Sequence, residues 1–246
     1  MRVVSLVPSW TETLLECGVK IVGRTRFCVH PERASAIPAI GGTKDLKLHE
    51  LKALQPDIVL VDKDENLPWM AEEHGWRTHV THVQAASDLP RELARLAALL
   101  ENPGLMSLGR AWETELRKPY PSRSVEQLPG VLEWWRRPAS EPERIVYLIW
   151  RDPWMAVSRE TFVGSMFEHL GFGRLFPEFS QRYPRLDLAS FDPDRTLLLF
   201  SSEPFPFAVK KPELGAFSGA LVDGEAYSWF GIRSLEFLRR SRLESP

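Results

Sequence analysis

Two kinds of side chain with binding chemistry recur together along this sequence of 246 residues: flat aromatic rings and charged groups. An aromatic ring stacks on a planar ligand, and a charged group orients a ligand through charge-assisted hydrogen bonds. The segments that combine both kinds are Arg26-Phe27-Cys28-Val29-His30, Lys63-Asp64-Glu65-Asn66, Trp150-Arg151-Asp152-Pro153-Trp154, Ser202-Glu203-Pro204 and Asp223-Gly224-Glu225 with Trp229. Together they predict a ligand site that works by stacking and charge.

The candidate ligand-binding residues divide by role. We expect stacking contacts from Phe27, Trp150, Trp154 and Trp229, and orientation from Arg26, Lys63, Glu65, Arg151, Glu203 and Glu225, with His30 and Asn66 beside them. Trp150 ends an apolar run, so packing between a strand and a helix is an equally good interpretation of that ring.

The same loops contain possible metal ligands. The weak metal candidates are His30, Glu65, Glu203 and Glu225, which could bind iron or zinc. We favour the alternative, in which these carboxylates pair with Arg26, Lys63 and Arg151. His79 and His82 cannot chelate together unless the strand ends between them, because residues i and i+3 on a strand point to opposite faces. We therefore expect no required cofactor.

Catalysis is the second interpretation. Ser202-Glu203 and the pair Asp223 and Glu225 are candidates for a nucleophile or an acid and base. No GxSxG, HExxH or phosphate-binding glycine motif accompanies them. We therefore assign no catalytic residue and predict a binding protein, with an enzyme or a chaperone for a metal or tetrapyrrole compound as the alternative.

The elements that would position these loops alternate between strand and helix. In the first part of the chain we expect strands at 3–7, 21–24, 58–61 and 77–83, and helices at 9–17, 48–54 and 67–74. In the last part we expect strands at 145–150, 196–201 and 220–223, and helices at 159–170 and 232–243. Ser9 with Glu12 is interpreted as a capping box, Ser158 as a second cap, and Gly18 and Gly171 as helix stops.

This order predicts an α/β protein with two Rossmann-like βα lobes bridged by helix, and a ligand cleft between them. The predicted domains are an N-terminal lobe at 1–84, bridging helices at 85–118, an irregular insertion at 119–143 and a C-terminal lobe at 144–246. Trp134 and Trp135 should cover a small core of the insertion.

Composition excludes several other classes. A net charge of −2 gives no general attraction for nucleic acid or a membrane surface, and no apolar run reaches the 20 residues of a membrane span. Cys17 and Cys28 cannot form a disulfide framework and are expected to be free thiols. The strand expected from residue 3 leaves no room for an export signal, so we expect a cytoplasmic protein, or a periplasmic one if a signal was removed.

Three stretches resemble a known bacterial family, the cobalamin and iron-siderophore binding proteins of ABC importers. They are Val3-Val4-Ser5-Leu6-Val7-Pro8-Ser9 with Glu12, Ile40-Gly41-Gly42-Thr43, and Leu51-Lys52-Ala53-Leu54-Gln55-Pro56-Asp57-Ile58-Val59. The resemblance covers nearly the whole chain outside 119–143. It implies a soluble transport protein that binds one corrinoid, metal chelate or other polar small molecule in the cleft.

The sequence also departs from the pattern of this family. Lys44 and Asp62 stand where the cobalamin receptors would have tryptophans, which implies a ligand smaller or more polar than cobalamin. His49 and Ala189 stand where the family has glutamates that dock on the permease. We therefore do not expect docking on an ABC permease of the known kind.

Overall fold

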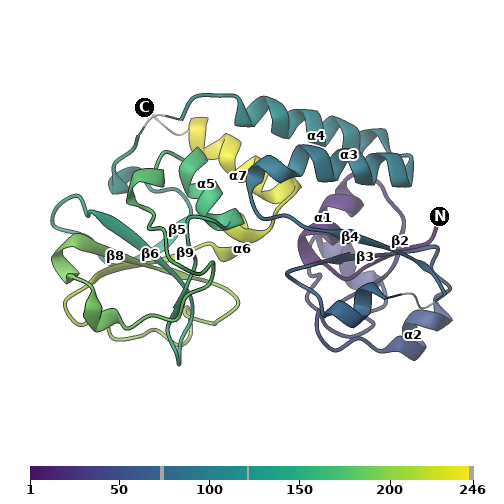
Figure 1. Ribbon diagram of the computed structural model, residues 1–246, viewed down its shortest axis with the longest axis horizontal. Helices are drawn as coiled ribbons and strands as arrows, with labels where there is room; N and C mark the ends of the chain where they lie inside the picture. The colour runs from purple at the N-terminus through teal and green to yellow at the C-terminus, as the bar shows by residue number, and fades with distance from the viewer. Residues whose placement is uncertain (73–74, 121, 244–246) are drawn as a thin grey trace. The chain divides into compact units, whose positions relative to one another are not determined.

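The computed structural model describes residues 1–72, 75–120 and 122–243. They form two compact α/β units, each built on one sheet (Figure 1). The first unit comprises Met1–Val83, Ser87–Glu115 and Phe230–Leu235, and the second comprises Gln84–Ala86, Leu116–Trp229 and Glu236–Pro246. The predicted α/β class is confirmed. Within the described ranges, no helix is long and apolar enough to cross a membrane.

The first unit contains a four-stranded parallel sheet in the order β2-β1-β3-β4. Its strands are β1 (Val3–Ser5), β2 (Ile21–Arg24), β3 (Ile58–Asp62) and β4 (Arg77–Thr81). Its helices are α1 (Pro8–Glu16), α2 (Leu48–Ala53), α3 (Leu89–Leu100) and α4 (Pro103–Leu116, of which Leu116 falls in the second unit), with 3-10 turns at Glu32–Ala36 and Pro68–Ala71. Every residue of β3 is buried, as expected for a strand covered on both faces.

Helices α3 and α4 pack closely side by side in the first unit (Figure 1). A β-carbon added at Gly109 of α4 would lie 3.3 Å from Cβ of Leu93 on α3. The missing side chain therefore allows the two helix backbones to approach each other.

The second unit contains a five-stranded sheet in the order β5-β9-β8-β6-β7. Its strands are β5 (Val131–Arg136), β6 (Arg144–Trp150), β7 (Met155–Ala156), β8 (Thr196–Ser201) and β9 (Ser218–Val222). Its helices are α5 (Phe162–His169), α6 (Gly224–Ser228) and the part of α7 (Ile232–Leu243) that follows Leu235, with 3-10 turns at Val125–Gln127, Gly173–Leu175, Leu188–Ser190 and Pro193–Arg195. The three central strands are parallel, whereas both edge strands are antiparallel to their neighbours.

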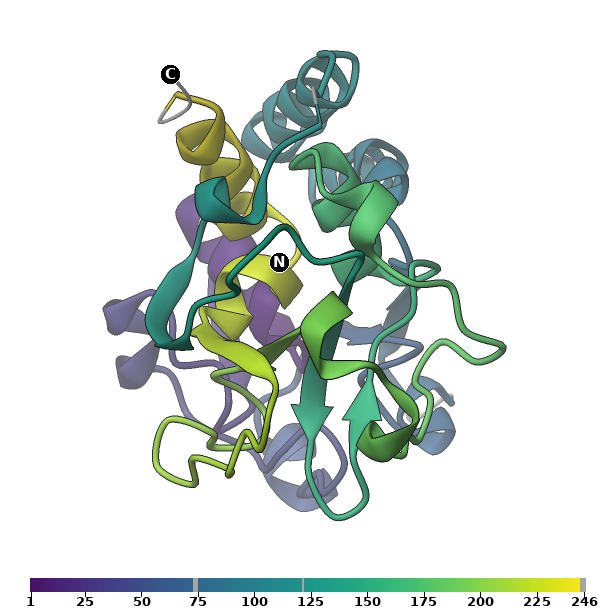
Figure 2. The same ribbon diagram turned by 90° about the vertical axis from the view of Figure 1, so that its left-hand side faces the viewer.

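The interpretation of 119–143 as irregular is wrong, because β5 lies inside that range and pairs with β9. Trp135 does not cover a separate small core. It packs on the core of the second unit, with its ring centroid 4.9 Å from that of Phe200. Figure 2 shows the segment that leads into β5, in teal, beside α7, in yellow. Arg123 in this segment donates to the Ser241 carbonyl of α7 at 3.0 Å.

The predicted capping box at Ser9 and Glu12 is also wrong. Helix α1 begins at Pro8, with Val7 at the N-cap position and no side-chain capping bond. Proline suits the first helical position because it has no N–H to satisfy, so Ser9 lies inside the helix. The Glu12 carboxylate instead accepts two hydrogen bonds from Arg233, at 2.6 and 2.8 Å.

Two further helix predictions need correction. Thr161 caps α5, accepting from the Gly164 amide at 3.0 Å, whereas Ser158 accepts from the Phe179 amide. The helix expected at 67–74 is only a 3-10 turn at Pro68–Ala71, and residues 73–74 lie outside the described ranges. The predicted stops at Gly18 and Gly171 are confirmed by their positive φ angles of 76° and 92°.

His79 on β4 is expected to make the stability of the first unit sensitive to pH. Its Nε2 atom is buried without a hydrogen-bond partner among the described residues, and burial, followed by the charge of Arg95, lowers its pKa. The folded state therefore favours the neutral ring, and the unfolded chain binds more protons below its ordinary pKa of about 6.5. We expect the free energy of unfolding to fall as the pH drops through this value toward the lower pKa of the folded state.

Urea unfolding at pH 7.5 and pH 5 measures this effect, and His79→Gln is the control because an amide does not titrate. The variant should lose less stability than the wild type between the two pH values. An equal loss in both proteins would assign the acid sensitivity to other groups.

Candidate functional site

The first predicted loop follows β2 and presents one exposed ring beside a charged group. Phe27 is 48% exposed, and the Arg26 guanidinium carbon lies 4.8 Å from the ring centroid. Arg26 also pairs with Asp45 at 2.7 Å. His30, farther along the loop, is half-buried. This loop therefore offers an aromatic face with a cation already placed over it.

The loop after β3 is held by its last residue. The Asn66 side chain accepts from the Asp62 amide at 2.8 Å and donates to the carbonyls of Leu6 and Thr43 at 3.2 and 3.1 Å. These bonds fix the loop that exposes Lys63 and Glu65. The structure thus gives Asn66 a positioning role, and a ligand contact by Asn66 stays a prediction.

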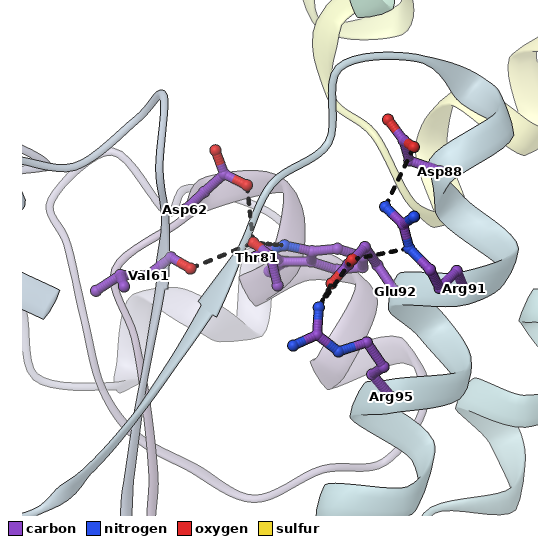
Figure 3. A network of polar contacts seen from close by, with 8 residues as sticks. Val61, Asp62, Thr81, Asp88, Arg91, Glu92 and Arg95 are labelled. Carbon is purple, nitrogen blue, oxygen red and sulfur yellow. Dashed lines mark hydrogen bonds and ion pairs between the residues drawn. The ribbon is translucent and has the colours of Figure 1, made fainter.

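Asp62 belongs to a buried polar network rather than to an open surface (Figure 3). Its Oδ2 atom lies 2.8 Å from the Thr81 hydroxyl, its Oδ1 atom accepts from the Asp64 amide at 3.0 Å, and the Trp10 indole donates to the Thr81 hydroxyl at 2.9 Å. Burial raises the pKa of Asp62. The sequence identified Asp62 as a departure from the family, and the structure shows that it supports the base of the loop.

The loop between β6 and β7 carries the most exposed tryptophan of the predicted set. Trp150 is 42% exposed, and its ring meets Phe205 edge to face at 5.4 Å. The exposed ring speaks against the alternative in which Trp150 is packed between a strand and a helix, and a ligand contact by Trp150 stays a prediction. Arg151 lies over Trp154 at 5.5 Å, and Trp154 stacks on Phe207 at 6.3 Å with an interplanar angle of 11°. A cation, an indole and a phenyl ring thus form one stack.

Glu203 occupies a different environment from the exposed carboxylates. One of its oxygens, Oε1, accepts from the Ser228 hydroxyl at 3.1 Å and from the Trp229 indole at 2.8 Å. Burial raises the pKa of Glu203, and the charges of Glu225 and Asp223 act in the same direction. The loop carboxylates are predicted to pair with Arg26, Lys63 and Arg151, and for Glu203 the pairing with an arginine is wrong. Arg26 pairs instead with Asp45, and Arg151 with Asp152 at 3.8 Å.

Trp229 is only 7% exposed and uses its indole N–H on Glu203. Little of its ring is open to a stacking partner, so the structure gives Trp229 a role in orienting Glu203. The ligand contact predicted for it remains a prediction.

The side chains considered for catalysis hold backbone groups. The Ser202 hydroxyl accepts from the Gly224 amide at 2.9 Å, and Asp223 caps α6 by accepting from the Ala226 amide at 3.0 Å. A side chain at Gly224 would collide with Ser201 and Glu203, since an added β-carbon would lie 2.4 Å from the Ser201 hydroxyl oxygen. These bonds position α6 and, with it, Ser228 and Trp229, which donate to Glu203.

The candidate metal ligands and the two cysteines form neither a metal site nor a disulfide among the described residues. Within residues 1–72, 75–120 and 122–243, no group of three or more His, Cys, Asp and Glu side chains is placed to hold a metal ion. Both cysteines are free, as expected. Cys28 is buried between the hydroxyls of Thr11 and Thr25, each 3.1 Å from its sulfur.

Sequence reasoning missed the segment after Glu203-Pro204. Phe205 contacts both Trp150 and Phe207, and the Lys210 ammonium lies 5.7 Å from the Phe205 ring centroid. The signal was present, because Phe205, Phe207 and Lys210 repeat the combination of rings and charges seen in the other loops. The predicted loop ended at Pro204 and therefore left them out.

Comparisons with known proteins find this fold in solved structures but find no related sequence. No protein-family model matches the sequence, and no curated protein sequence matches it. Solved structures do match it over nearly its whole length. The periplasmic vitamin B12 binding protein BtuF of Vibrio cholerae has a TM-score of 0.72 at 13% identity, covering 98% of this chain and 94% of that chain.

Two heme-binding proteins match in the same way. The periplasmic heme-binding protein RhuT from Roseiflexus sp. RS-1 has a TM-score of 0.70 at 18% identity, covering 98% of this chain and 96% of that chain. IsdE of S. aureus, solved in complex with heme, has a TM-score of 0.71 at 13% identity, covering 100% and 99%. The chain therefore has the fold of the periplasmic binding proteins, which confirms the fold predicted from the resemblance.

Proposed function

We propose that this protein binds one small molecule, a tetrapyrrole or a metal chelate, as a substrate-binding protein. The observation that carries the proposal is the stack after β6, where Arg151 covers Trp154 and Trp150 exposes its ring beside Phe205. Exposed aromatic surface combined with cations suits a flat ligand that carries negative groups. The likeness to proteins that bind vitamin B12 and heme supports this class of ligand.

The ligand class is tested by titration. Tryptophan fluorescence should be quenched on addition of hemin, because Trp150 and Trp154 lie in the proposed contact region. Absorption spectra and native mass spectrometry of the purified protein would identify a ligand that co-purifies. If the protein carries no coloured or metal-containing ligand and binds neither hemin nor a ferric chelate, the proposed function is wrong.

We expect cyanocobalamin to bind no more tightly than the micromolar range. Lys44 is exposed, and Asp62 is buried in its hydrogen-bond network, so neither position supplies a stacking ring. Calorimetric titration with cyanocobalamin measures this, with hemin as the comparison ligand. A nanomolar dissociation constant for cyanocobalamin would contradict the prediction that the ligand is smaller or more polar than cobalamin.

The fold alone does not establish whether this protein works with an ABC permease. The docking positions predicted from the family, His49 and Ala189, are both exposed, and neither carries a carboxylate. We therefore propose that the protein does not dock through glutamates of the known kind. The cytoplasmic location predicted from the sequence stays a prediction, which cell fractionation tests. No feature of the site favours the alternative of an enzyme or a chaperone.

A further inference from the structure

A pocket of about 310 Å³ lies in the second unit, where no ligand residue was predicted. Its walls include Tyr120, Ser122, Arg159, Glu168 and Arg174, with the backbone of two glycines. Guanidinium, hydroxyl and carboxyl groups thus converge on a space large enough for a small metabolite. None of these side chains belongs to the site proposed above.

The pocket lies toward the amino-terminal ends of the strands, away from the ligand loops. Arg174 pairs at 3.0 Å with Glu141, which comes three residues before β6 begins. Chain geometry places Arg159 at the same end, because β7 runs antiparallel to β6 and Ala156 already lies opposite Leu148. The loops after β6, β8 and β9 leave the carboxyl ends of these parallel strands, which is the opposite end of the sheet. Occupancy of the pocket therefore does not compete directly with the proposed ligand.

Hydrogen bonds to backbone carbonyls hold the guanidinium of Arg159 in place. Its Nε atom donates to the Phe176 carbonyl at 3.1 Å, and its Nη2 atom donates to the carbonyls of Gly173 and Phe176, both at 2.8 Å. Among the described residues, no carboxylate pairs with Arg159 and no group accepts from its Nη1 atom. Its charge is therefore fixed in position and is not neutralised by an ion pair.

Other groups add to the positive charge around the pocket. Arg174 donates to the Ser122 hydroxyl at 3.1 Å and is balanced by Glu141. Burial lowers the pKa of the neighbouring Arg123, and the charge of Arg242 lowers it further. On the acidic side, the Tyr120 hydroxyl lies 3.5 Å from Glu168. Two arginines and one glutamate thus line the pocket, and among the described residues only Arg174 of these two arginines has a carboxylate partner, which leaves Arg159 for a bound anion.

We propose that this pocket binds a small anion with a carboxylate or a phosphate monoester group. Arg159 supplies a fixed planar donor, Arg174 a second cation, and the hydroxyls of Tyr120 and Ser122 further hydrogen bonds. Glu168 can accept a hydrogen bond from a hydroxyl or amino group elsewhere on the same molecule. The site is independent of the proposed function, because it uses different residues at the other end of the sheet.

Titration with inorganic phosphate and, separately, with succinate tests the site, at constant ionic strength set with chloride. Backbone amide NMR shifts of Gly171, Gly173 and Arg174 should change and saturate in at least one series. Saturation with phosphate alone identifies the phosphate group, and saturation with succinate alone identifies the carboxylate. The absence of saturable shifts at these amides in both series would overturn the proposal.

Variants then locate the anion. Arg159→Gln should weaken binding about tenfold, since a charge-assisted hydrogen bond is lost. Arg137→Gln is the matched control, because that arginine is exposed in the same unit and lies over Trp134. If Arg159→Gln does not fold, the double variant Tyr120→Phe with Ser122→Ala replaces it and should also weaken binding. Unchanged affinity in a folded Arg159→Gln protein, or in the double variant, would overturn the proposed location.

Discussion

Replacing Phe167 by alanine is expected to lower the free energy of unfolding of the second unit by about 3–5 kcal/mol. Phe167 on α5 is fully buried, and its ring stacks on Tyr227 at 4.7 Å and on Phe176 at 4.6 Å. The variant loses the burial of one large ring, leaves a cavity, and removes ring contacts worth about 0.5–1.5 kcal/mol per pair beyond the buried area. Urea unfolding followed by circular dichroism measures the loss.

The same substitution has a consequence for the ligand site. Tyr227 lies on α6, and the two residues after it, Ser228 and Trp229, donate to Glu203. Loosening of α6 should therefore weaken ligand binding, although Phe167 itself is not one of the predicted ligand residues. Tyr183→Ala is the control, because Tyr183 is 42% exposed, and we expect it to cost less than about 1 kcal/mol. Equal losses in the two variants would show that the α5–α6 ring contacts contribute little to stability.

Much of the fold could be predicted from sequence because its central strands are continuous apolar runs. The strand predicted at 196–201 has the bounds of β8, and the one predicted at 58–61 is one residue shorter than β3. Such runs bury both faces of a parallel strand and leave few alternatives. The helix predicted at 232–243 also has the bounds of α7.

The elements that were missed depend on contacts distant in sequence. The edge strand β5 has exposed Leu132 and Glu133 and a charged, proline-rich neighbourhood, so only its pairing with β9 shows it to be a strand. The short helix α6 begins at Gly224, a residue with low intrinsic helix propensity. Its formation depends on the cap by Asp223 and on the fit of that glycine against Ser201 and Glu203.

The candidate site was predictable as a set of loops but not as a set of exposed side chains. The sequence indicates that Trp150 and Trp229 both belong to these loops, yet one is 42% exposed and the other 7%. The difference arises because Trp229 donates to Glu203, a carboxylate 26 residues away whose burial no local pattern indicates. Asp62 is a similar case, since its partner Thr81 lies on the neighbouring strand.

Replacing Arg151 by alanine is expected to leave the melting temperature of the free protein nearly unchanged and to abolish its rise on ligand binding. Arg151 lies over Trp154 at 5.5 Å, and its side chain is 39% exposed. Its pair with Asp152 has an N–O distance of 3.8 Å and an aspartate that is 90% exposed, so water screens it. Such a surface pair is worth about 0–1 kcal/mol.

The Arg151 guanidinium is expected to contribute more free energy to ligand binding than its surface ion pair contributes to stability. It can stack on a flat ligand or donate two parallel hydrogen bonds to an anionic group of the ligand. Hydrogen bonds to charged groups contribute about 1.5–3 kcal/mol. Its loss should therefore weaken hemin binding about 10–100-fold. Because ligand stabilisation depends on the ratio of ligand concentration to dissociation constant, the rise in melting temperature should vanish at moderate hemin concentrations.

Arg137→Ala is the matched control for this experiment, since Arg137 also covers an indole, that of Trp134, at 4.8 Å, but lies outside the ligand loops. It removes the same kind of cation and ring contact without touching the proposed site. Thermal melting with and without hemin should then separate the two arginines, with the ligand-induced rise kept in Arg137→Ala and lost in Arg151→Ala. If Arg151→Ala instead melts clearly lower when free and keeps its ligand-induced rise, Arg151 supports the fold, and the ligand lies away from the stack of Arg151, Trp154 and Phe207.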